Sequence, residues 1–575
     1  MGHPLWVPRS QPLEMVEGPF PPLIGKLLAS RGILDKTQVE KTLNPKLGDL
    51  KDPLSLFGMD IALERILKAY HNDEKICIYA DFDLDGTSGL ALLLAGLEAL
   101  GFKNVLSYQP KRLSEGYGFH KSAVEDLKER GVSLIITVDV GITAVEAVAR
   151  ANELGVDVII TDHHLPGEKL PEALVIVNPN QPQCQSQLGY LCGAGVAFYL
   201  LRGLKRALVE AGVASAQNFD LKEVLDFFTI GTLTDMVPLV DDNRVLVKHG
   251  LVKLAETKRA GLRALLNSLG FSGRTLTSQD VAIKFAPKLN ALSRMEAGVL
   301  PIDIFLEKSA TRAEELVHFV LDQNSQRVKF QSDAESRAME LLKDWSHQDF
   351  VFVVSEEFHR GVLGLIATKL SQNFNRPAFV GSVNAEGVVV GSARLPNGME
   401  SCLVTALTSA EHALTRFGGH AAAAGFEFHL HAQNQVMESL AKHFSETKEQ
   451  DRPLKIEYDI EASLADINKQ TMTWHDFVGP FGTGFQIPLF KFKRVQLLSK
   501  KELKGGHYRL KLSSDNPSQD SSVEALLFTP THRQLQELRR GETFDLLGEM
   551  QWNYFAGAKT IQLLVRDLKV AEENS

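Results

Sequence analysis

The sequence is poor in cysteine, with only four among 575 residues: Cys77, Cys184, Cys192 and Cys402. They form no C-x-x-C pair, and their spacing is not that of a disulfide framework. This scarcity argues against a small secreted fold held by disulfides. It predicts reduced thiols that are mostly buried, the usual state of free cysteine.

Long apolar runs are also missing. No stretch of about 18 apolar residues occurs, and the start of the chain has neither the basic region nor the apolar core of a signal peptide. We therefore expect no membrane segment and a cytoplasmic location. The net charge of −9 argues against a uniformly basic surface for nucleic acid, although a local basic channel is compatible with a negative total.

The length of the chain, 575 residues, suggests three or four domains at about 150 residues per domain. Residues 50–260 alternate short β-branched runs with helical patterns; the runs are KICIYAD, SLIITVDVG, VDVIITDHH and LVIVN. This rhythm predicts an α/β domain with a parallel sheet. Residues 261–345 are expected to form a helical connector. It would contain one long helix from Thr311 to Trp345, opened by a T-x-x-E capping box at Thr311 and Glu314.

A change of pattern marks the second half of the chain. Residues 346–445 predict a smaller α/β domain with strands in DFVFVVS and RPAFVGSV. Residues 450–575 contain five short β-runs without helices, which favours a small barrel such as an OB-fold. Residues 1–49 are expected to pack on the core as an N-terminal segment.

Three aspartates stand at alternate positions in ICIYADFDLDGTSG, and Asp81, Asp83 and Asp85 would share one side of an extended chain. The D-x-D-x-D-G pattern matches the first half of a calcium loop. However, Leu92 stands where such a loop requires a glutamate. The aspartates therefore predict a cation site outside an EF-hand.

Further acidic and imidazole groups end other apolar runs. Asp139 ends LIITVDVG, the trio Asp162, His163 and His164 ends VIITDHH, and Asp235 ends FFTIGTLTD, which we interpret as another strand. Loops at the carboxyl ends of parallel strands converge on one crevice, where so many carboxylates need divalent cations to neutralise them. Oxygen donors with one or two imidazoles favour Mn²⁺ or Mg²⁺. They suffice for two ions about 3.5 to 4 Å apart, an arrangement suited to phosphoryl hydrolysis. Any one aspartate, taken alone, could equally be a helix N-cap.

The motifs DFDLDG, VDVG and TDHH resemble the DHH phosphoesterase superfamily and, within it, the RecJ family of bacterial single-strand-specific exonucleases. The resemblance runs over about residues 22–430 and includes PKRLSEGYGF, LCGAGVAF, IGTLTDMVPL, PKLNALSRM, FHRGVLGLIATKL, GSARL and FGGHAAAAGF. It implies a DHH domain, a DHHA1 domain and a C-terminal OB domain. It further implies 5′ to 3′ hydrolysis of single-stranded DNA to 5′-mononucleotides in DNA repair and recombination, with two divalent ions, Mn²⁺ or Mg²⁺.

The same resemblance assigns roles to individual residues. The implied metal ligands are Asp83, Asp85, Asp139, His163 and Asp235. The implied catalytic partners are Asp81, Asp162 and His164, and the implied substrate-binding residues are Arg112, Arg294, Ser392, Arg394 and His420. A single-stranded DNA 5′ end is the expected partner, with single-strand-binding protein and a helicase by analogy. The sequence departs from the family pattern at Phe82, and at Phe485 and Gln486 in PFGTGFQIPLF.

The C-terminal region has a local excess of positive charge. Alternation in HYRLKL places His507, Arg509 and Lys511 on one strand face. With the nearby aromatics Trp552, Tyr554 and Phe555, this face would suit a single-strand platform, although these aromatics could equally form the barrel core. Two other functions remain open: a DHH phosphodiesterase acting on oligoribonucleotides, cyclic dinucleotides or polyphosphate, and a non-catalytic replication scaffold.

Overall fold

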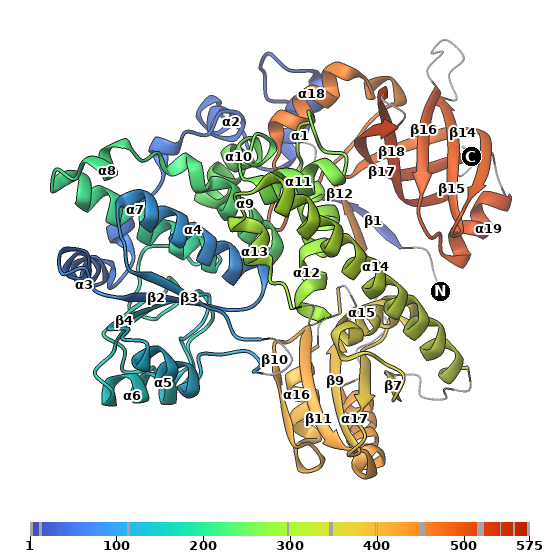
Figure 1. The fold of residues 1–575 in the computed structure, drawn as a ribbon. Coiled ribbons are helices and arrows are strands. Elements are labelled where there is room, and N and C mark those ends of the chain that lie inside the picture. The colour runs from blue at the N-terminus through green and yellow to red at the C-terminus, as the bar shows by residue number, and fades with distance from the viewer. Residues whose placement is uncertain are drawn as a thin grey trace. The chain divides into compact units, whose positions relative to one another are not determined.

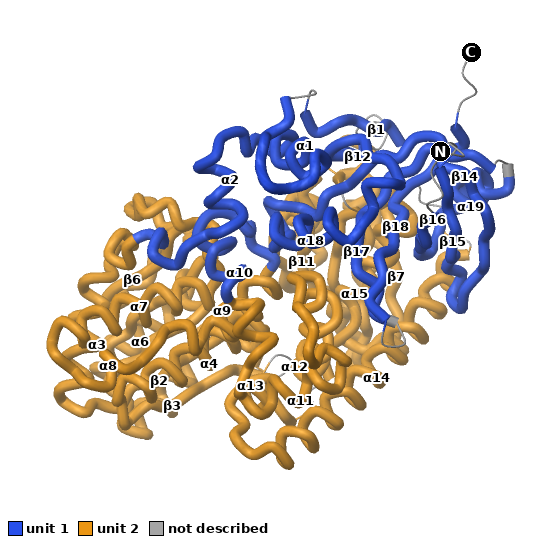
Figure 2. Tube along the Cα trace, turned by 90° about the horizontal axis from the view of Figure 1, so that it is seen from above, with its two compact units in different colours: residues 1–51, 236–249, 453–575 blue, residues 52–235, 250–452 orange. Residues whose placement is uncertain are grey.

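The computed structural model describes residues 4–10, 14–111, 115–295, 298–343, 345, 349–396, 398–399, 401–447, 455–514, 522–540, 542–555 and 558–571. The chain divides into two compact units (Figure 2). The core unit consists of residues 52–235 and 250–452, and the barrel unit of residues 1–51, 236–249 and 453–575. None of the helices in the described part of the chain combines the length and the hydropathy needed to span a lipid bilayer.

The core unit begins with a five-stranded sheet in the order β3-β2-β4-β5-β6, in which every pair is parallel. Its strands are β2 (Ile76–Ala80), β3 (Val105–Tyr108), β4 (Leu134–Val138), β5 (Asp157–Thr161) and β6 (Val175–Val177). The central strands β2, β4 and β5 are almost wholly buried, as expected for a parallel sheet covered on both faces, whereas the edge strand β3 is partly exposed. The predicted parallel α/β domain is confirmed.

Helices cover both faces of this sheet (Figure 1). The helices of this domain are α3 (Met59–His71), which precedes the first strand, and α4 (Leu84–Leu100), α5 (Lys121–Glu129), α6 (Val145–Glu153), α7 (Gly193–Glu210), α8 (Ala214–Asn218) and α9 (Leu225–Asp235), which come after it. Helices α5 and α6 pack with the sheet in one apolar cluster, and α4 and α7 lie over the other face. The chain passes from β2 outward to β3 and then returns to β4 on the other side of β2. The carboxyl ends of β2 and β4 therefore form a topological switch point, the usual binding position in such sheets.

Helix α10 (Asp241–Ala255) begins in the barrel unit and ends in the core unit. Within the core unit, the helices that connect the parallel-sheet domain to the next are α11 (Ala260–Ser268), α12 (Ala286–Arg294), α13 (Pro301–Leu306) and α14 (Ala310–Leu341). The long helix exists and begins within one residue of the predicted start, but the predicted capping box and the predicted end at Trp345 were wrong. Ser309 is the N-cap, and its side chain accepts a hydrogen bond from the Arg312 amide, so Thr311 lies inside the helix. The helix ends at Leu341, and Trp345 lies beyond it, where its ring packs against Phe350 and its indole N–H donates to the Phe350 carbonyl (2.9 Å).

The second domain of the core unit contains a five-stranded sheet in the order β10-β11-β9-β8-β7, parallel only between β7 and β8. Its elements are β7 (Val351–Ser355), α15 (Leu363–Phe374), β8 (Ala378–Val383), β9 (Val388–Arg394), α16 (Leu403–Ser409), β10 (Arg416–Gly419), β11 (Ala423–His429) and α17 (Gln433–Glu446). Helix α15 packs in one apolar cluster, and α16 and α17 pack in another with the phenylalanines of the sheet. The predicted smaller α/β domain is confirmed.

The barrel unit contains a six-stranded sheet in the order β13-β14-β15-β16-β18-β17, which an additional β14–β17 pairing closes into a barrel. Its strands are β13 (Ile460–Glu461), β14 (Phe490–Leu503), β15 (His507–Ser514), β16 (Ser522–Leu527), β17 (Thr543–Phe555) and β18 (Ala558–Val570). The prediction of β-runs without helices was wrong, because α18 (Lys469–Val478) and α19 (His532–Arg540) belong to this region. The predicted barrel is confirmed.

Residues from the start of the chain complete this unit. Strand β1 (Leu5–Pro8) pairs in parallel with β12 (Lys455–Tyr458). Helices α1 (Pro22–Ser30) and α2 (Lys36–Leu43) follow, and α1 contributes Leu23, Ile24, Leu27 and Leu28 to the apolar core of the barrel. Phe485, one of the departures from the family pattern, lies beside two guanidinium groups: Arg244 is 4.1 Å and Arg31 is 4.7 Å from its ring centroid.

Candidate metal centre

The three neighbouring aspartates occupy a strand-to-helix turn. Asp81 follows β2, Asp83 is the N-cap of α4, and Asp85 lies in the first turn of that helix. The Asp83 carboxylate accepts hydrogen bonds from the amides of Asp85 (2.9 Å) and Gly86 (3.0 Å). The prediction that the three share one side of an extended chain was therefore wrong, because the chain enters a helix after Asp83.

Asp139 follows β4, directly across the switch point from Asp81. Its backbone has φ 61°, a left-handed conformation that is uncommon outside glycine, and its amide donates to the Thr161 carbonyl (3.0 Å). Residues held in this way cluster at functional sites, because the surrounding structure must stabilise the strain. A β-carbon on Gly193 would lie 2.3 Å from the Asp139 β-carbon, so only glycine fits there.

Three residues follow β5, and the first of them orients the other two. Asp162 is fully buried, and its Oδ1 accepts from the amides of His163 (2.7 Å) and His164 (3.1 Å) and from the His164 Nδ1 (2.8 Å). Its Oδ2 accepts from the Ile142 amide (3.0 Å). Its Oδ1 alone accepts three hydrogen bonds from His163 and His164, and Asp162 belongs to none of the candidate ligand clusters among the described residues, so it orients the two histidines instead of facing an ion.

Asp235 is the last residue of α9, so the interpretation of FFTIGTLTD as a strand was wrong. The helix nevertheless brings Asp235 to the ends of the strands, since its Oδ2 lies 3.6 Å from the His163 Nε2. Close packing makes this possible. A β-carbon on Gly231 would lie 2.6 Å from the Ala194 side chain and 2.8 Å from the Asp85 Oδ1.

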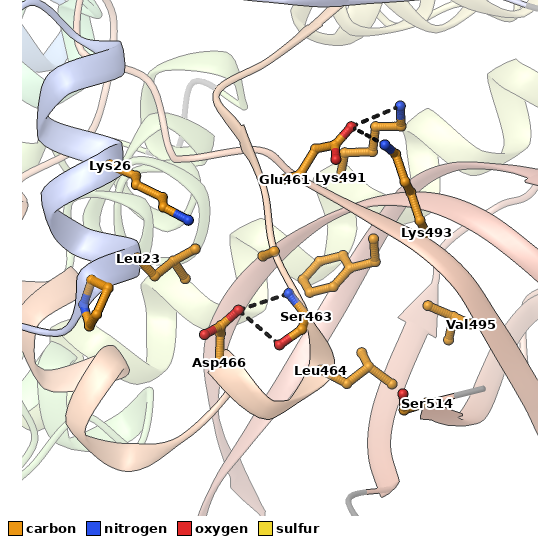
Figure 3. Close-up of a pocket in the computed structure, with 13 residues that line it drawn as sticks. Leu23, Lys26, Glu461, Ser463, Leu464, Asp466, Lys491, Lys493, Val495 and Ser514 are labelled. Carbon is orange, nitrogen blue, oxygen red and sulfur yellow. Dashed lines mark hydrogen bonds and ion pairs between the residues drawn. The ribbon is translucent and has the colours of Figure 1, made fainter. Parts of the chain in front are cut away.

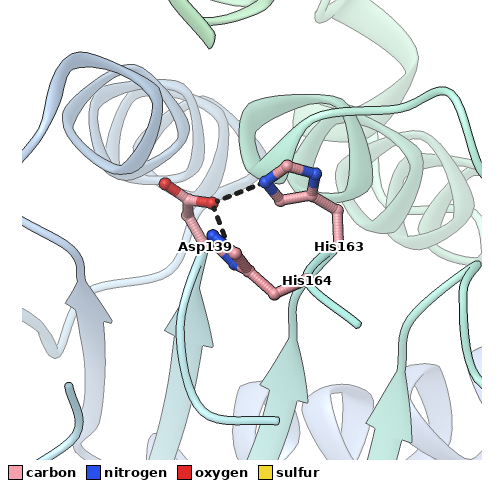
Figure 4. Close-up of side chains that lie close together, drawn as sticks. All are labelled: Asp139, His163 and His164. Atoms are coloured by element: carbon pink, nitrogen blue, oxygen red, sulfur yellow. Dashed lines mark ion pairs between the residues drawn. The ribbon is translucent and has the colours of Figure 1, made fainter. Parts of the chain in front are cut away.

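Asp139 lies close to both His163 and His164 (Figure 4), and His163 also approaches Asp85 and Asp235. The His163 Nε2 lies 3.1 Å from the Asp139 Oδ1 and 3.9 Å from the Asp85 Oδ2. Candidate ligand atoms come within 4.8 Å of one another in three sets: Asp81, Asp83 and Asp139; Asp85, His163 and Asp235; and Asp139, His163 and His164. The first two sets have no member in common, so the residues can surround two ions.

The atoms at the middle of this group are unsatisfied. The Asp139 Oδ1, the His163 Nε2 and the Asp235 Oδ2 are buried, and none has a hydrogen-bond partner among the described residues. Buried polar atoms without partners are costly and need an explanation. They are also the donor types that Mn²⁺ and Mg²⁺ bind, so these residues fit a divalent cation.

The electrostatics lead to the same conclusion. Burial, together with the neighbouring carboxylates, raises the pKa of Asp85 and Asp139 well above the usual value. Burial and the charge of Asp83 raise the pKa of Asp235 to about 6. Burial and the nearby His164 lower the pKa of His163 to about 4, which leaves a neutral imidazole ready to ligate. Burial opposes charge on His164, but the hydrogen bond to Asp162 raises its pKa to about 9.

One feature of the site was missed from the sequence. The amides of Gly193 and Ala194, in the first turn of α7, donate to the two oxygens of Asp85 at 2.6 and 2.9 Å. Helix N-termini bind anions in this way. The motif LCGAGVAF, with small residues opening a helix, was the available signal.

The predicted substrate-binding residues fall into separate places. Arg112 lies outside the described residues. His420 is exposed in the turn between β10 and β11. The Arg394 Nη1 donates to the Ser392 Oγ (2.9 Å), and a β-carbon on Gly364, at the start of α15, would lie 2.8 Å from the Arg394 Nη2.

Arg294 lies near the same helix start. Its Nη1 donates to the carbonyl of Gly361 (3.1 Å), which belongs to the short helix η5 (Arg360–Val362) just before α15. The structure therefore gathers Arg294, Ser392 and Arg394 around the N-terminus of α15.

A separate cavity of about 410 Å³ lies in the barrel unit between α1 and β14 (Figure 3). Both acidic side chains in its lining already have partners within the barrel unit. Glu461 pairs with Lys491 (3.3 Å) and Lys493 (2.8 Å), while Asp466 accepts from Ser463. No residue of the candidate metal centre lines it.

Comparisons with known proteins agree with this architecture. Three family models match the chain: "DHH family, N-terminal domain" over residues 75–232, "DHHA1 domain" over residues 347–448 and "RecJ OB domain" over residues 458–567. A Bacillus subtilis protein named single-stranded-DNA-specific exonuclease RecJ is 33% identical over 555 residues, covering 96% of this chain and 68% of the relative. The Haemophilus influenzae protein of the same name is 30% identical over 96% of this chain and 97% of the relative.

Solved structures show the same similarity. The crystal structure of Thermus thermophilus RecJ with Mn²⁺ matches with a TM-score of 0.78 and 27% identity, over 96% of this chain and 76% of that one. The Mg²⁺ complex of the same protein matches with a TM-score of 0.72 and 25% identity, over 96% and 75%. The ions in these relatives are the two that the ligand set predicts.

Proposed function

Because the chain belongs to the RecJ family of DHH-domain proteins, we propose that it hydrolyses single-stranded DNA from the 5′ end and releases 5′-mononucleotides. The observation that supports this most strongly is the convergence of Asp85, Asp139, His163 and Asp235 from four separate segments of the chain. Among them, buried ligand atoms of Asp139, His163 and Asp235 have no hydrogen-bond partner among the described residues. Such an arrangement can hold two divalent ions, which is the kind of centre that hydrolyses phosphodiester bonds.

The proposed metal ligands are Asp83, Asp85, Asp139, His163 and Asp235, with Asp81 beside them. When bound, two divalent ions would supply water activation and stabilisation of the charge on phosphate oxygens. The protein contributes orientation. The amides of Gly193 and Ala194 fix the Asp85 carboxylate, and the packing of Gly193 against Asp139 leaves that side chain little freedom.

Asp162 and His164 act next to these ligands. The 2.8 Å hydrogen bond from the His164 Nδ1 to Asp162 fixes the tilt of the imidazole, as a buried carboxylate does for a catalytic histidine. An imidazole held in this way can donate a hydrogen bond to a phosphate oxygen or to the departing 3′ oxygen. We propose this role for His164, with Asp162 as its positioning residue.

Polarity of digestion would come from the group at the start of α15. Arg394 and Ser392 offer a planar guanidinium and a hydroxyl side by side, a combination suited to phosphate oxygens. The helix N-terminus adds a favourable partial charge. We propose that Arg294, Ser392 and Arg394 bind the 5′ phosphate, and that Arg112 and His420 contact the adjoining DNA.

The outer face of strands β14, β15 and β16 of the barrel would bind the remainder of the single-stranded DNA. Register places Lys501 opposite Arg509 and Ser499 opposite Lys511, so three exposed cations share this face. Phe528, 50% exposed, lies directly beyond the end of β16, and its ring is 5.0 Å from that of His507. An exposed aromatic ring next to cations is the pattern of a single-strand platform.

The aromatics predicted from the sequence are less suitable for this role. The Trp552 Nε1 donates to Asp476 (2.7 Å), and the Lys559 Nζ lies 4.0 Å from the Trp552 ring centroid. Tyr554 also has Lys559 near its ring, at 5.6 Å, and the side chain of Phe555 lies outside the described part of the structure. We therefore propose Phe528 as the stacking residue of the barrel.

The deciding experiment is digestion of end-labelled DNA in Mn²⁺, with 5′-phosphorylated single strands, 5′-dephosphorylated single strands and blunt duplex in parallel. We expect mononucleotides from the 5′ end of single strands, released faster from phosphorylated than from dephosphorylated ends, with no product from blunt duplex and no activity with Asp139→Ala. Activity that begins at 3′ ends, or that persists in Asp139→Ala, would contradict the proposal. A cytoplasmic role in repair and recombination, with a helicase and single-strand-binding protein, remains a prediction from the family.

A further inference from the structure

A short loop between β3 and α5 presents Tyr117 in a fixed position. Tyr117 stands between Gly116 (φ 80°) and Gly118 (φ 128°), and both glycines have backbone conformations that other residues rarely adopt. On the far side, the buried Tyr79 donates its hydroxyl to the Gly118 carbonyl (2.9 Å), and the Phe119 ring packs 4.8 Å from the Tyr79 ring. The loop is therefore anchored just after Tyr117.

The near side of the loop is anchored as well. One oxygen of Glu115 accepts from the Tyr108 hydroxyl (2.9 Å), and the other accepts from the Lys111 amide (2.8 Å). Anchors on both sides of Tyr117 hold its backbone in place, although residues 115–120 form neither a helix nor a strand. In the segment EGYG, the contacts of Glu115 and Gly118 therefore fix the backbone of Tyr117 from both sides.

The Tyr117 side chain borders the metal centre but remains accessible. Its hydroxyl lies 3.5 Å from the His164 Nδ1, and the two rings meet edge to face with centroids 5.8 Å apart. Even so, 49% of Tyr117 is exposed, and Leu165, the next residue after His164, is 73% exposed. A metal centre made of carboxylates and imidazoles thus has an apolar, aromatic edge.

An aromatic edge at this place suits one part of the substrate. Carboxylates and cations engage the phosphate, whereas an exposed aromatic ring beside them offers a flat face for a base. A nucleobase adjoins each phosphate at a distance of one sugar. Stacking on a ring accepts every base, because every base has a π-face, and an exonuclease needs that tolerance.

We propose that Tyr117 is the platform for the nucleobase next to the scissile phosphate. This inference rests on the proposed function, since it names the part of the DNA that Tyr117 contacts. Stacking would place the reacting nucleotide over the metal centre, and the pinned loop would make that placement reproducible. The aromatic ring, not the hydroxyl, would carry the effect.

The test uses single-stranded DNA with a 5′ phosphate and an abasic unit at the first or the second position. Wild type, Tyr117→Ala, Tyr117→Phe and, as a matched control, Phe57→Ala are compared by kcat/KM for release of the labelled terminus. Phe57 is an exposed aromatic of the same unit, 51% accessible, just before α3. Loss of a stacked base should cost about 5- to 150-fold.

For wild type, Tyr117→Phe and Phe57→Ala, we expect kcat/KM on at least one of the two abasic substrates to be about fivefold or more below kcat/KM on intact DNA. We expect Tyr117→Ala to be slow on intact DNA and to show no further loss on that abasic substrate. The inference fails if Tyr117→Ala and wild type show the same abasic penalty, or if Tyr117→Phe is as slow as Tyr117→Ala, which would assign the effect to the hydroxyl. Failure of the proposed function would look different, because wild type itself would not degrade intact DNA.

Discussion

The Nε2 atom of His163 lies 3.1 Å from Oδ1 of Asp139, although the two residues follow different strands. Burial of both atoms, with no hydrogen-bond partner among the described residues, gives the pair little stability unless a cation lies between the ligands. Asp235, from a helix, lies 3.6 Å from the same nitrogen. The contact therefore links two strand ends and a helix end in one centre.

Replacement of Asp139 should abolish catalysis. We expect Asp139→Asn to lower kcat by about 10³-fold or more, because several kcal/mol of charge stabilisation depend on the bound ions. Asp126→Asn, which changes a surface carboxylate paired with Arg130, should leave activity within about twofold. Single-turnover hydrolysis together with Mn²⁺ titration checks both, and an active Asp139→Asn would refute the assignment.

The small residues around the centre should be as sensitive as the ligands. Gly231→Ala would place a methyl group 2.8 Å from the Asp85 Oδ1, so we expect weaker Mn²⁺ binding and a loss of about 1–3 kcal/mol in the free energy of unfolding. Gly48→Ala is a matched control, because nothing lies within 4 Å of the new methyl group. Denaturant unfolding and Mn²⁺ titration give the comparison, and equal behaviour of the two variants would show that close packing at Gly231 is unimportant.

Metal binding should depend on pH in a definite direction. Because burial and the charge of Asp83 raise the pKa of Asp235 to about 6, this carboxyl is protonated below that pH and must lose its proton to ligate. Mn²⁺ affinity should therefore fall as the pH decreases through about 6, by about tenfold per unit for each displaced proton. The raised pKa values of Asp85 and Asp139 act in the same direction and extend proton release to higher pH.

Calorimetry in buffers of different ionisation enthalpy counts the protons released on Mn²⁺ binding. Asp235→Asn should release fewer protons than wild type at pH 5.5. An affinity that stays constant between pH 5 and 8 would contradict this account of the electrostatics.

Recognition of the 5′ end should depend on Arg394. The preference of wild type for a 5′ phosphate over a 5′ hydroxyl should decrease by about tenfold or more in Arg394→Gln, since charge-assisted hydrogen bonds contribute about 1.5–3 kcal/mol. Arg416→Gln, an exposed arginine on β10 of the same domain, is the control. The ratio of kcat/KM for the two ends is the measurement, and an unchanged ratio in Arg394→Gln would place the 5′ phosphate elsewhere.

Binding of long single strands should depend on the outer face of the barrel. Arg509→Gln should reduce the slope of log K against log salt by about 0.7, the contribution of one phosphate contact on a single strand. Phe528→Ala should weaken binding by about 1–3 kcal/mol without changing that slope, because stacking carries no charge. Equal affinities of wild type and Phe528→Ala at every salt concentration would exclude Phe528 as a platform.

The sequence predicted the parallel sheet well because its strands are short, β-branched and buried. It failed at α9 for a related reason. All of Leu225–Leu233 is buried, so the helix shows no polar face and FFTIGTLTD reads like a buried strand. Asp235 was correctly expected near the ends of the parallel strands, but it reaches them from the end of a helix and not from the end of a strand.

The alternate spacing of Asp81, Asp83 and Asp85 also gave a wrong prediction, because it suggested an extended chain where the structure has a turn into a helix. A β-carbon on Gly86 would lie 2.5 Å from the Asp81 carbonyl oxygen, so the chain turns tightly here, and this turn is a tertiary feature that spacing does not reveal. The packing of α1 into the barrel core was also beyond the sequence, since no local pattern identifies a partner more than 400 residues away.

The most direct test of the central claim is anomalous diffraction at the manganese edge from crystals of the protein grown with Mn²⁺. We expect two peaks, one bounded by Asp81, Asp83 and Asp139 and the other by Asp85, His163 and Asp235. No peak at these residues, or manganese bound only elsewhere on the chain, would contradict the account.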